Sequence, residues 1–383
     1  MERIHSINPE RIIWCCADFG LTVEQLAAEI GVSIATLEKV LAAEDGCGLT
    51  FSQLSKLAAF FGRGVLFFME PGPVQVEKVH TSAFRTLANQ KPELSPKLKL
   101  LIERVEQQRA VFQALRDELD DVELPRFVHP VLPERLEDVA RVVREWLELG
   151  ATNTFETYRK AIENRGILVF RSNGYNGKWQ IASDSPIVGF SIYDADCPVI
   201  VVKKLYNDAH LTFTLMHELG HLLLHKESSI DDEDDIHAHR GVEQEANAFA
   251  GLVLVPEQFL GRIDDAARPN DVSEFDNWLS QHRRSWGVST EVILRRLLDS
   301  GRLPQQTYVA YRRWLKGLPA DVADVGTRIY RHREPKNIFG DTFVRTVLGA
   351  LSGRRITLSK ASKYLDGLSL NDLHKLERHY ATL

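Results

Sequence analysis

The chain has little cysteine and no long uncharged apolar run. Its four cysteines, Cys15, Cys16, Cys47 and Cys197, form no CxxC pair among 383 residues. The sequence therefore indicates neither a disulfide framework nor a four-cysteine zinc site. No stretch approaches the roughly eighteen apolar residues of a membrane helix, and the first residues lack the basic start and apolar core of a secretory signal. We expect a soluble cytoplasmic protein with no membrane partner.

The chain also lacks an even distribution of charge, although its overall net charge is only −6. Residues 1–70 carry five Lys and Arg against nine Asp and Glu, a net charge of −4. Residues 301–383 carry fifteen against seven, a net charge of +8. Because charge decides which surfaces attract nucleic acid, we expect the two ends of the chain to have different partners.

Proline-rich stretches indicate the domain boundaries. Pro71-Gly72-Pro73 closes a first helical part, and prolines at 125, 130 and 133 precede a mixed one. We predict a multidomain, mainly α protein. Its expected parts are an all-α domain at 1–72, a linker with a long helix at 73–133, a small α+β domain at 134–300, and a basic, mainly helical domain at 301–383.

The first part, residues 1–72, shows apolar residues at helical spacing with glycines at the helix ends. Thr22 begins one helix with Gln25 three residues later, which is the pattern of a capping box, and Ser33 begins the next helix. Gly31 between these helices supplies the tight turn of a helix-turn-helix. The pattern predicts an N-terminal all-α helix-turn-helix domain.

This domain resembles the Xre family of phage-repressor-like DNA-binding domains through Gln25-Leu26-Ala27, Gly31-Val32-Ser33 and Leu37. The resemblance implies a DNA-binding function. However, phosphate contacts normally come from Lys and Arg, and the domain is acidic. Two kinds of partner therefore stay open for it: DNA, or a protein, including a second copy of this chain in a homodimer.

The linker and the third part are predicted from their local patterns. We expect an extended piece through Thr86 and then a polar helix that begins at Ser95-Pro96, because serine suits the N-cap and proline the first helical position. After two amphipathic helices, β-branched runs predict strands at three places, 167–170, 188–193 and 198–202. The acidic run from Asp231 to Asp235 is interpreted as a solvated loop.

The main candidate site is the run His217-Glu218-Leu219-Gly220-His221 in an apolar helix. Residues four apart lie on the same face of a helix, so His217 and His221 can present two imidazoles to one metal ion. Glu218 can then act as general base on a water molecule at that ion, which is the chemistry that the HExxH spacing serves. The alternative is a buried helix that carries histidines by chance, but those histidines would need polar partners.

A third ligand is expected from a second helix that begins near Gly241. This helix offers Glu243 and Glu245, which lie about 200° apart on a helix, so only one of them can face the ion. Glu243 shares its face with small and apolar residues suited to close packing, and we choose it as the ligand. Asn247, one turn on, is a candidate for orienting a histidine. Glu245 remains the alternative ligand.

These two stretches together resemble the ImmA/IrrE family of metallopeptidases. The resemblance is carried by Phe213-Thr214-Leu215 before the HExxH run, by Glu243-Gln244-Glu245-Ala246-Asn247-Ala248-Phe249-Ala250, and by Val255-Pro256. It covers most of residues 134–300. It implies a zincin-like fold and a gluzincin-like zinc metallopeptidase with His217, His221 and Glu243 as metal ligands and Glu218 as the catalytic base. The ligand set accepts Zn²⁺ and also Mn²⁺.

Three further histidines are given smaller roles. His225 continues the four-residue series but drifts about 40° around the helix with each step, so we interpret it as a helix-end group. His237 and His239 are expected at the surface.

The basic C-terminal segment alternates cations with aromatics. Tyr308, Tyr311 and Trp314 lie beside arginines, and Tyr330 lies among Arg328, Arg331 and Arg333. Such a surface could hold single-stranded nucleic acid by phosphate contacts and base stacking. We favour the other interpretation, a solvated helix face whose aromatic residues point into the core.

The family resemblance implies a regulatory endopeptidase that cleaves a repressor or antitoxin-like protein and so switches on stress-response or mobile-element genes. Two alternatives stay open. One is an Xre-type transcriptional regulator that binds DNA through its N-terminal domain or its basic C-terminal segment, and the other is an antitoxin-like interaction protein. In both, the metallopeptidase-like domain would serve as a sensor or scaffold.

Overall fold

The structure is a computed structural model. It describes residues 3–44, 47–75, 82–91, 94–119, 124–173, 177–205, 207–237, 240–318 and 330–382. The chain forms two compact units, Met1–Gln107 and Gln108–Leu383. Of the helices in the described ranges, none is both long enough and apolar enough to cross a membrane.

The first unit is a small helical domain with its own core. Thr22 and Gln25 form the expected capping box, and Ser33 accepts a hydrogen bond from the Thr36 backbone N–H at 3.2 Å. Gly31 takes the left-handed conformation between the two helices (φ 66°). The helices predicted for this segment are present, although its assignment as a DNA-binding domain stays a prediction. The elements are α1 (Pro9–Phe19), α2 (Val23–Ile30), α3 (Ile34–Leu41), α4 (Phe51–Phe60), η1 (Val65–Phe68), and the short strands β1 (Arg3–Ile4) and β2 (Leu49–Thr50).

The linker is more helical than the sequence suggested. The extended piece expected through Thr86 is wrong in its second half, because α6 covers Ser82–Gln90. The long polar helix is confirmed as α7, Pro96–Glu118, with the Ser95 hydroxyl accepting from the Leu98 backbone N–H at 3.4 Å.

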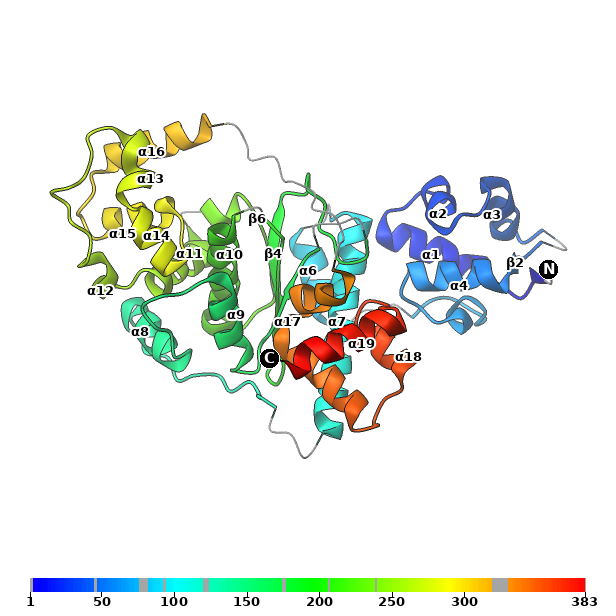
Figure 1. The fold of residues 1–383 in the computed structure, drawn as a ribbon. Helices are drawn as coiled ribbons and strands as arrows, with labels where there is room; N and C mark the ends of the chain where they lie inside the picture. The colour runs from blue at the N-terminus through cyan, green and yellow to red at the C-terminus, as the bar shows by residue number, and fades with distance from the viewer. Residues whose placement is uncertain are drawn as a thin grey trace. The chain divides into compact units, whose positions relative to one another are not determined.

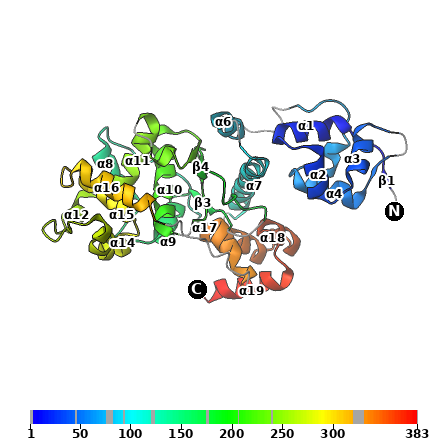
Figure 2. The same cartoon turned by 90° about the horizontal axis from the view of Figure 1, so that it is seen from above.

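The second unit is built around a four-stranded mixed sheet in the order β3-β5-β4-β6. The strands β3 and β5 are parallel, and β4 runs antiparallel to both β5 and β6. Three of these strands match the predicted ones, and β6 was missed. Figures 1 and 2 show α10 and α11 on one side of this sheet and α17 on the other. The strands are β3 (Leu168–Arg171), β4 (Ile187–Ile192), β5 (Val199–Val202) and β6 (Ser229–Asp232).

Both faces of the sheet are buried, which explains why β3, β4 and β5 are mainly apolar. On one face, Val169 and Ile200 belong to the main core with Leu215 of α10. On the other face, Phe170 contacts Phe339 and Phe343 of α17 with ring centroids 5.6 and 5.8 Å apart. Helix α17, from the C-terminal segment, therefore covers the second face of the sheet.

Helices make up most of the second unit. The helices near the sheet, including the motif helix α10, are α8 (Leu136–Trp146), α9 (Phe155–Glu163), α10 (Asp208–Gly220), η2 (His221–His225), η3 (Asp235–His237) and α11 (Gly241–Leu254). Further along the chain lie α12 (Glu257–Leu260), η4 (Val272–Glu274), α13 (Phe275–Trp278), α14 (Ser280–Trp286), α15 (Thr290–Asp299), α16 (Gln305–Lys316), η5 (Arg331–Arg333), α17 (Glu334–Ser352), α18 (Leu358–Tyr364) and α19 (Leu370–Ala381).

The aromatic residues of α16 lie in the core, as the favoured interpretation had it. Tyr308 and Tyr311 are buried, and the Tyr311 hydroxyl donates to Asp276 at 2.9 Å. Arg312 forms an ion pair with Glu291 at 2.9 Å. Arg328 lies outside the described residues. The buried aromatics of α16 thus form no stacking surface for nucleic acid, whereas Tyr330 is exposed beside Arg333 and the favoured interpretation is wrong for it.

Candidate metal centre

The motif helix α10 places its histidines deep in the second unit. Asn207 caps its first turn, and the helix continues directly into the single π-helical turn η2. His217, Glu218 and His221 are all buried, between the sheet and α11. A π-helical turn is rare and occurs most often next to functional sites.

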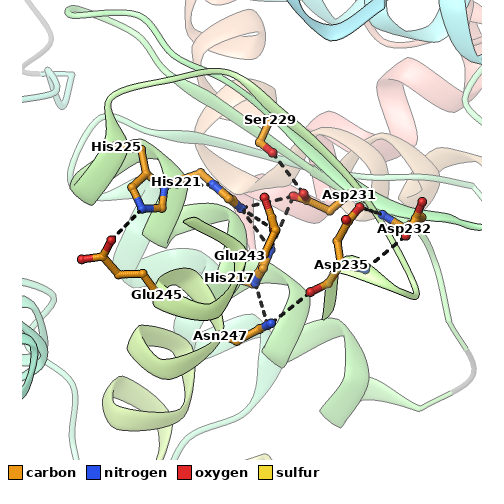
Figure 3. A network of polar contacts seen from close by, with 10 residues as sticks. All are labelled: His217, His221, His225, Ser229, Asp231, Asp232, Asp235, Glu243, Glu245 and Asn247. Atoms are coloured by element: carbon orange, nitrogen blue, oxygen red, sulfur yellow. Dashed lines mark hydrogen bonds and ion pairs between the residues drawn. The ribbon is translucent and has the colours of Figure 1, made fainter. Parts of the chain in front are cut away.

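The second helix, α11, can approach α10 closely because the facing residues are small. A Cβ added at Gly220 would lie only 3.3 Å from the Cα of Ala246 and 3.1 Å from the Phe249 ring. This contact brings Glu243, in the first turn of α11, to the histidine pair, as Figure 3 shows. Glu245 instead faces His225, with 3.3 Å between His225 Nε2 and Glu245 Oε2. The structure thus brings together the ligand set chosen from the sequence and leaves the alternative glutamate outside it.

The distances between the donor atoms suit a shared metal ion. The Nε2 atoms of His217 and His221 are 3.0 Å apart, and Glu243 Oε2 lies 3.2 Å from the first and 3.3 Å from the second. Donors about 2.1 Å from one zinc ion at tetrahedral corners are separated by about 3.4 Å. The three side chains can therefore hold one ion without moving far.

A fourth donor, Asp231, was not recognised in the sequence. Its Oδ2 atom lies 3.6 Å from the Nε2 atom of each histidine, and its side chain is buried. The interpretation of the acidic run as a solvated loop is wrong for its first residues, since Asp231 and Asp232 lie in β6 and the turn begins at Glu233. A strand was hard to expect because aspartate is depleted in strands.

The other ring nitrogens of the two histidines are held by neighbouring side chains. His217 Nδ1 lies 2.9 Å from Asn247 Oδ1, and Asn247 Nδ2 donates to the backbone oxygen of Asp235 at 3.0 Å. His221 Nδ1 lies 3.0 Å from His225 Nδ1. Such contacts fix the orientation of a ligating imidazole and direct its Nε2 atom to the metal. Asn247 is therefore placed as the sequence suggested, whereas His239 and the side chain of His237 lie outside the described residues.

Glu218, the expected general base, is fully buried. Neither of its carboxylate oxygens has a hydrogen-bond partner among the described residues. Burial, together with the nearby charge of Asp231, raises the pKa of Glu218 well above its usual value. The carboxylate fits beside strand β4 only because residue 189 is glycine, since a Cβ there would lie 2.7 Å from Glu218 Oε1.

The electrostatics of the cluster favour a cation. Burial opposes protonation of His217, but the carboxylates of Asp231 and Glu243 overcome this and raise its pKa to about 9. Asp231 Oδ2 and Glu243 Oε2 lie within 3.6 Å of the imidazoles, yet neither makes a hydrogen bond of good geometry to any described residue. A divalent ion at the centre would satisfy these oxygens and replace the proton on histidine.

Comparison with known proteins agrees with this geometry. Residues 162–298 match the family model for the IrrE N-terminal-like domain, Peptidase_M78. This match supports the resemblance to the ImmA/IrrE family of peptidases that the sequence indicated.

Part of the chain also matches a curated protein. The chain is similar to the uncharacterized immunity region protein 2 of Bacillus phage phi105, with 34% identity over 95 residues. The matched region is 22% of this chain and spans 60% of the length of the relative. No solved structure matches the chain significantly.

Proposed function

We propose that this protein is a regulatory zinc-dependent endopeptidase, in which His217, His221 and Glu243 hold the metal and Glu218 is the general base. The observation that carries the proposal is that His217, His221 and Glu243 converge from the motif helix, its π-helical turn and α11, with the buried Glu218 next to them. A zinc ion held by His217, His221 and Glu243 would supply Lewis-acid chemistry for activating water and polarising the scissile carbonyl. Glu218 takes the proton from the attacking water and delivers it to the leaving amine.

The proposed substrate is a protein, either a repressor or an antitoxin-like partner, whose cleavage switches on stress-response or mobile-element genes. The peptidase family supports a protein substrate, and the phage relative is named after an immunity region. The N-terminal unit would then recognise the substrate or DNA. Its acidic composition favours a protein partner over the phosphate backbone.

One observation favours the alternative, in which the domain serves as a scaffold for a DNA-binding regulator or an adaptor. Four protein donors around one ion, with Asp231 included, are typical of a structural zinc site. A structural site, however, has no need of Glu218, whose burial without a described partner costs stability. We therefore place the peptidase first.

The ligand set can be tested by metal analysis of three proteins. Wild type and Glu245→Ala are expected to hold close to one zinc ion per chain after reconstitution and desalting. Glu243→Ala is expected to hold well under half of that, because this variant lacks one of the three proposed metal ligands. Elemental mass spectrometry measures the content, and Glu245→Ala is the matched control two residues away. Equal zinc in both variants, or no zinc in the wild type, would contradict the proposal.

The role of Gly189 gives a second test. A Cβ at this position would lie 2.7 Å from Glu218 Oε1 and 2.8 Å from Thr214 Cγ2, so Gly189→Ala must displace the carboxylate. We expect proteolysis to fall about 10- to 100-fold, because misplacing a catalytic group by about 1 Å has this effect. Zinc content should not change.

The control is Gly150→Ala, where an added Cβ meets no described atom within 4 Å. Proteolysis is measured by counting new protein N-termini in cells that produce each variant. Full activity in Gly189→Ala would show that proteolysis does not depend on the position of the Glu218 carboxylate beside β4.

A further inference from the structure

The carboxylate of Asp231 lies in one cluster with His217, His221 and Glu243, with donor atoms all within 4.8 Å of one another, where it can serve as a fourth ligand (Figure 3). Its Oδ2 atom is equidistant from the two Nε2 atoms, 3.6 Å from each. That separation is close to the distance of about 3.4 Å expected between two donor atoms around a tetrahedral zinc ion. Catalytic zinc sites keep this fourth position open for water, whereas structural sites fill it with protein.

Two local features direct Asp231 to this place. The register between β4 and β6 shifts between Ile187 and Gly189, opposite Asp232 and Asp231. Such bulges bend a strand and redirect a side chain, and they are common next to active sites. In addition, the Ser229 hydroxyl donates to Asp231 Oδ1 at 3.0 Å. This hydrogen bond fixes the carboxylate so that Oδ2 faces the histidines.

Asp231 lies near the imidazoles of His217 and His221, each 3.6 Å from its Oδ2 atom, and near the carboxylates of Glu218 and Glu243. The side chain is almost fully buried, and its Oδ2 atom has no hydrogen-bond partner among the described residues. Two further carboxylates, Glu218 and Glu243, lie close to it and would repel it. Clustering carboxylates in a buried site is unfavourable unless positive charge compensates them, so the arrangement favours a metal ion that these carboxylates and the two imidazoles share.

We propose that Asp231 is a fourth protein ligand that closes the metal centre and holds the peptidase in a resting state. This inference rests on the proposed function. With Asp231 on the metal, the position that water needs beside Glu218 is filled. Cleavage then requires that β6 shift and withdraw the carboxylate.

The segment that carries Asp231 is suited to such a shift. The strand β6 has four residues and lies at the edge of the sheet, where β4 is its one neighbour among the described strands. It ends in a turn in which Asp232 Oδ1 accepts the backbone N–H groups of Asp234 and Asp235 at 2.9 and 3.1 Å. The backbone oxygen of Asp235 is held by Asn247, the residue that contacts His217. A partner that moves this turn would therefore act directly on the metal centre.

Cobalt substitution can test whether the fourth position is closed. The protein is loaded with Co²⁺ alone, and azide, a small anion that binds open metal positions, is added while the visible absorption is recorded. In the wild type we expect the tetrahedral Co²⁺ spectrum to be unchanged by azide. In Asp231→Ala the spectrum is expected to shift on azide addition, and zinc affinity to fall at least about tenfold.

Matched variants complete the test. Asp234→Ala removes an exposed carboxylate from the same turn and should behave as the wild type. Asp231→Asn keeps the shape of the side chain and should also open the site, which protects the test against misfolding of the alanine variant. In cells, the Asp231 variants are expected to produce new N-termini without an activating signal.

The failures of the two proposals can be told apart. If the wild type binds Co²⁺ and azide shifts its spectrum, the fourth position is open and the role of Asp231 is wrong, while the peptidase proposal stands. If the wild type binds neither Co²⁺ nor Zn²⁺, the proposed function itself fails. If azide leaves the spectra of both Asp231 variants unchanged, Asp231 is not a ligand.

Discussion

Replacing Glu218 with glutamine is expected to lower proteolysis by about 10²- to 10⁴-fold, because an amide cannot take the proton from water. The fold and the zinc content should be retained. Glutamine has the same shape as glutamate, and the buried carboxylate makes no hydrogen bond to any described residue that its loss would break. Removal of a buried negative charge beside Asp231 should, if anything, stabilise the folded protein.

The measurement compares new protein N-termini in cells that produce the wild type or Glu218→Gln, so the substrate need not be identified beforehand. Peptides that appear only with the wild type identify the cleaved protein and the cleavage site. Glu227→Gln, an exposed glutamate shortly after the same helix, is the matched control and should cleave normally. Undiminished cleavage by folded, zinc-loaded Glu218→Gln would disprove the role of this residue.

Local patterns in the sequence were sufficient for most of the helices up to α11 and for three of the four strands of the main sheet. Capping is a property of a few consecutive residues, so Thr22 and Ser95 could be recognised without knowing what packs around them. The same holds for the pair His217 and His221, since four-residue spacing in a helix decides that they share a face. Glu243 could be preferred over Glu245 because it shares its face of α11 with Ala246 and Ala250, which allow close packing.

Features that depend on distant contacts could not be predicted in this way. Five acidic residues in succession are normally solvated, and nothing local indicates that the first of them, Asp231, is buried among histidines. Its burial follows from the pairing of β6 with β4 and from a register shift at Gly189. The π-helical turn at His221–His225 likewise breaks the regular helical drift on which the interpretation of His225 relied.

Helix α17 contains another feature that depends on distant contacts. It is broken at Gly340, which has φ 81° and ψ 174°. Before the break, Arg159 donates to the carbonyl oxygens of Asn337 and Ile338 at 3.0 and 3.1 Å. After it, Glu163 Oε2 accepts the backbone N–H groups of Asp341 and Thr342 at 3.2 and 3.1 Å. The cation therefore caps the end of one helical segment and the anion the start of the next, as the helix dipoles require.

Substitution of Gly340 by alanine is expected to destabilise the second unit by at least about 3 kcal/mol. Its backbone conformation is almost restricted to glycine, which alone costs an alanine about 1–3 kcal/mol. The added Cβ would also lie 1.8 Å from Glu163 Oε1 and so break the buried pair of Glu163 and Arg159. Breaking a buried pair typically costs about 3–5 kcal/mol, since one charge stays buried without a partner.

Calorimetry can measure this effect against a control in the same helix. Gly349→Ala places its Cβ 3.9 Å from Leu119 Cδ1, an ordinary contact, and alanine is the better helix former there. We expect Gly349→Ala to melt at or above the wild-type temperature, and Gly340→Ala to melt about 6 °C or more below it. Equal melting of the two variants would mean that the Arg159 and Glu163 caps do not hold α17 against α9 and β3. A large loss would show that the C-terminal segment is part of the peptidase unit, because Arg159 also donates to Val169 of β3 at 2.6 Å.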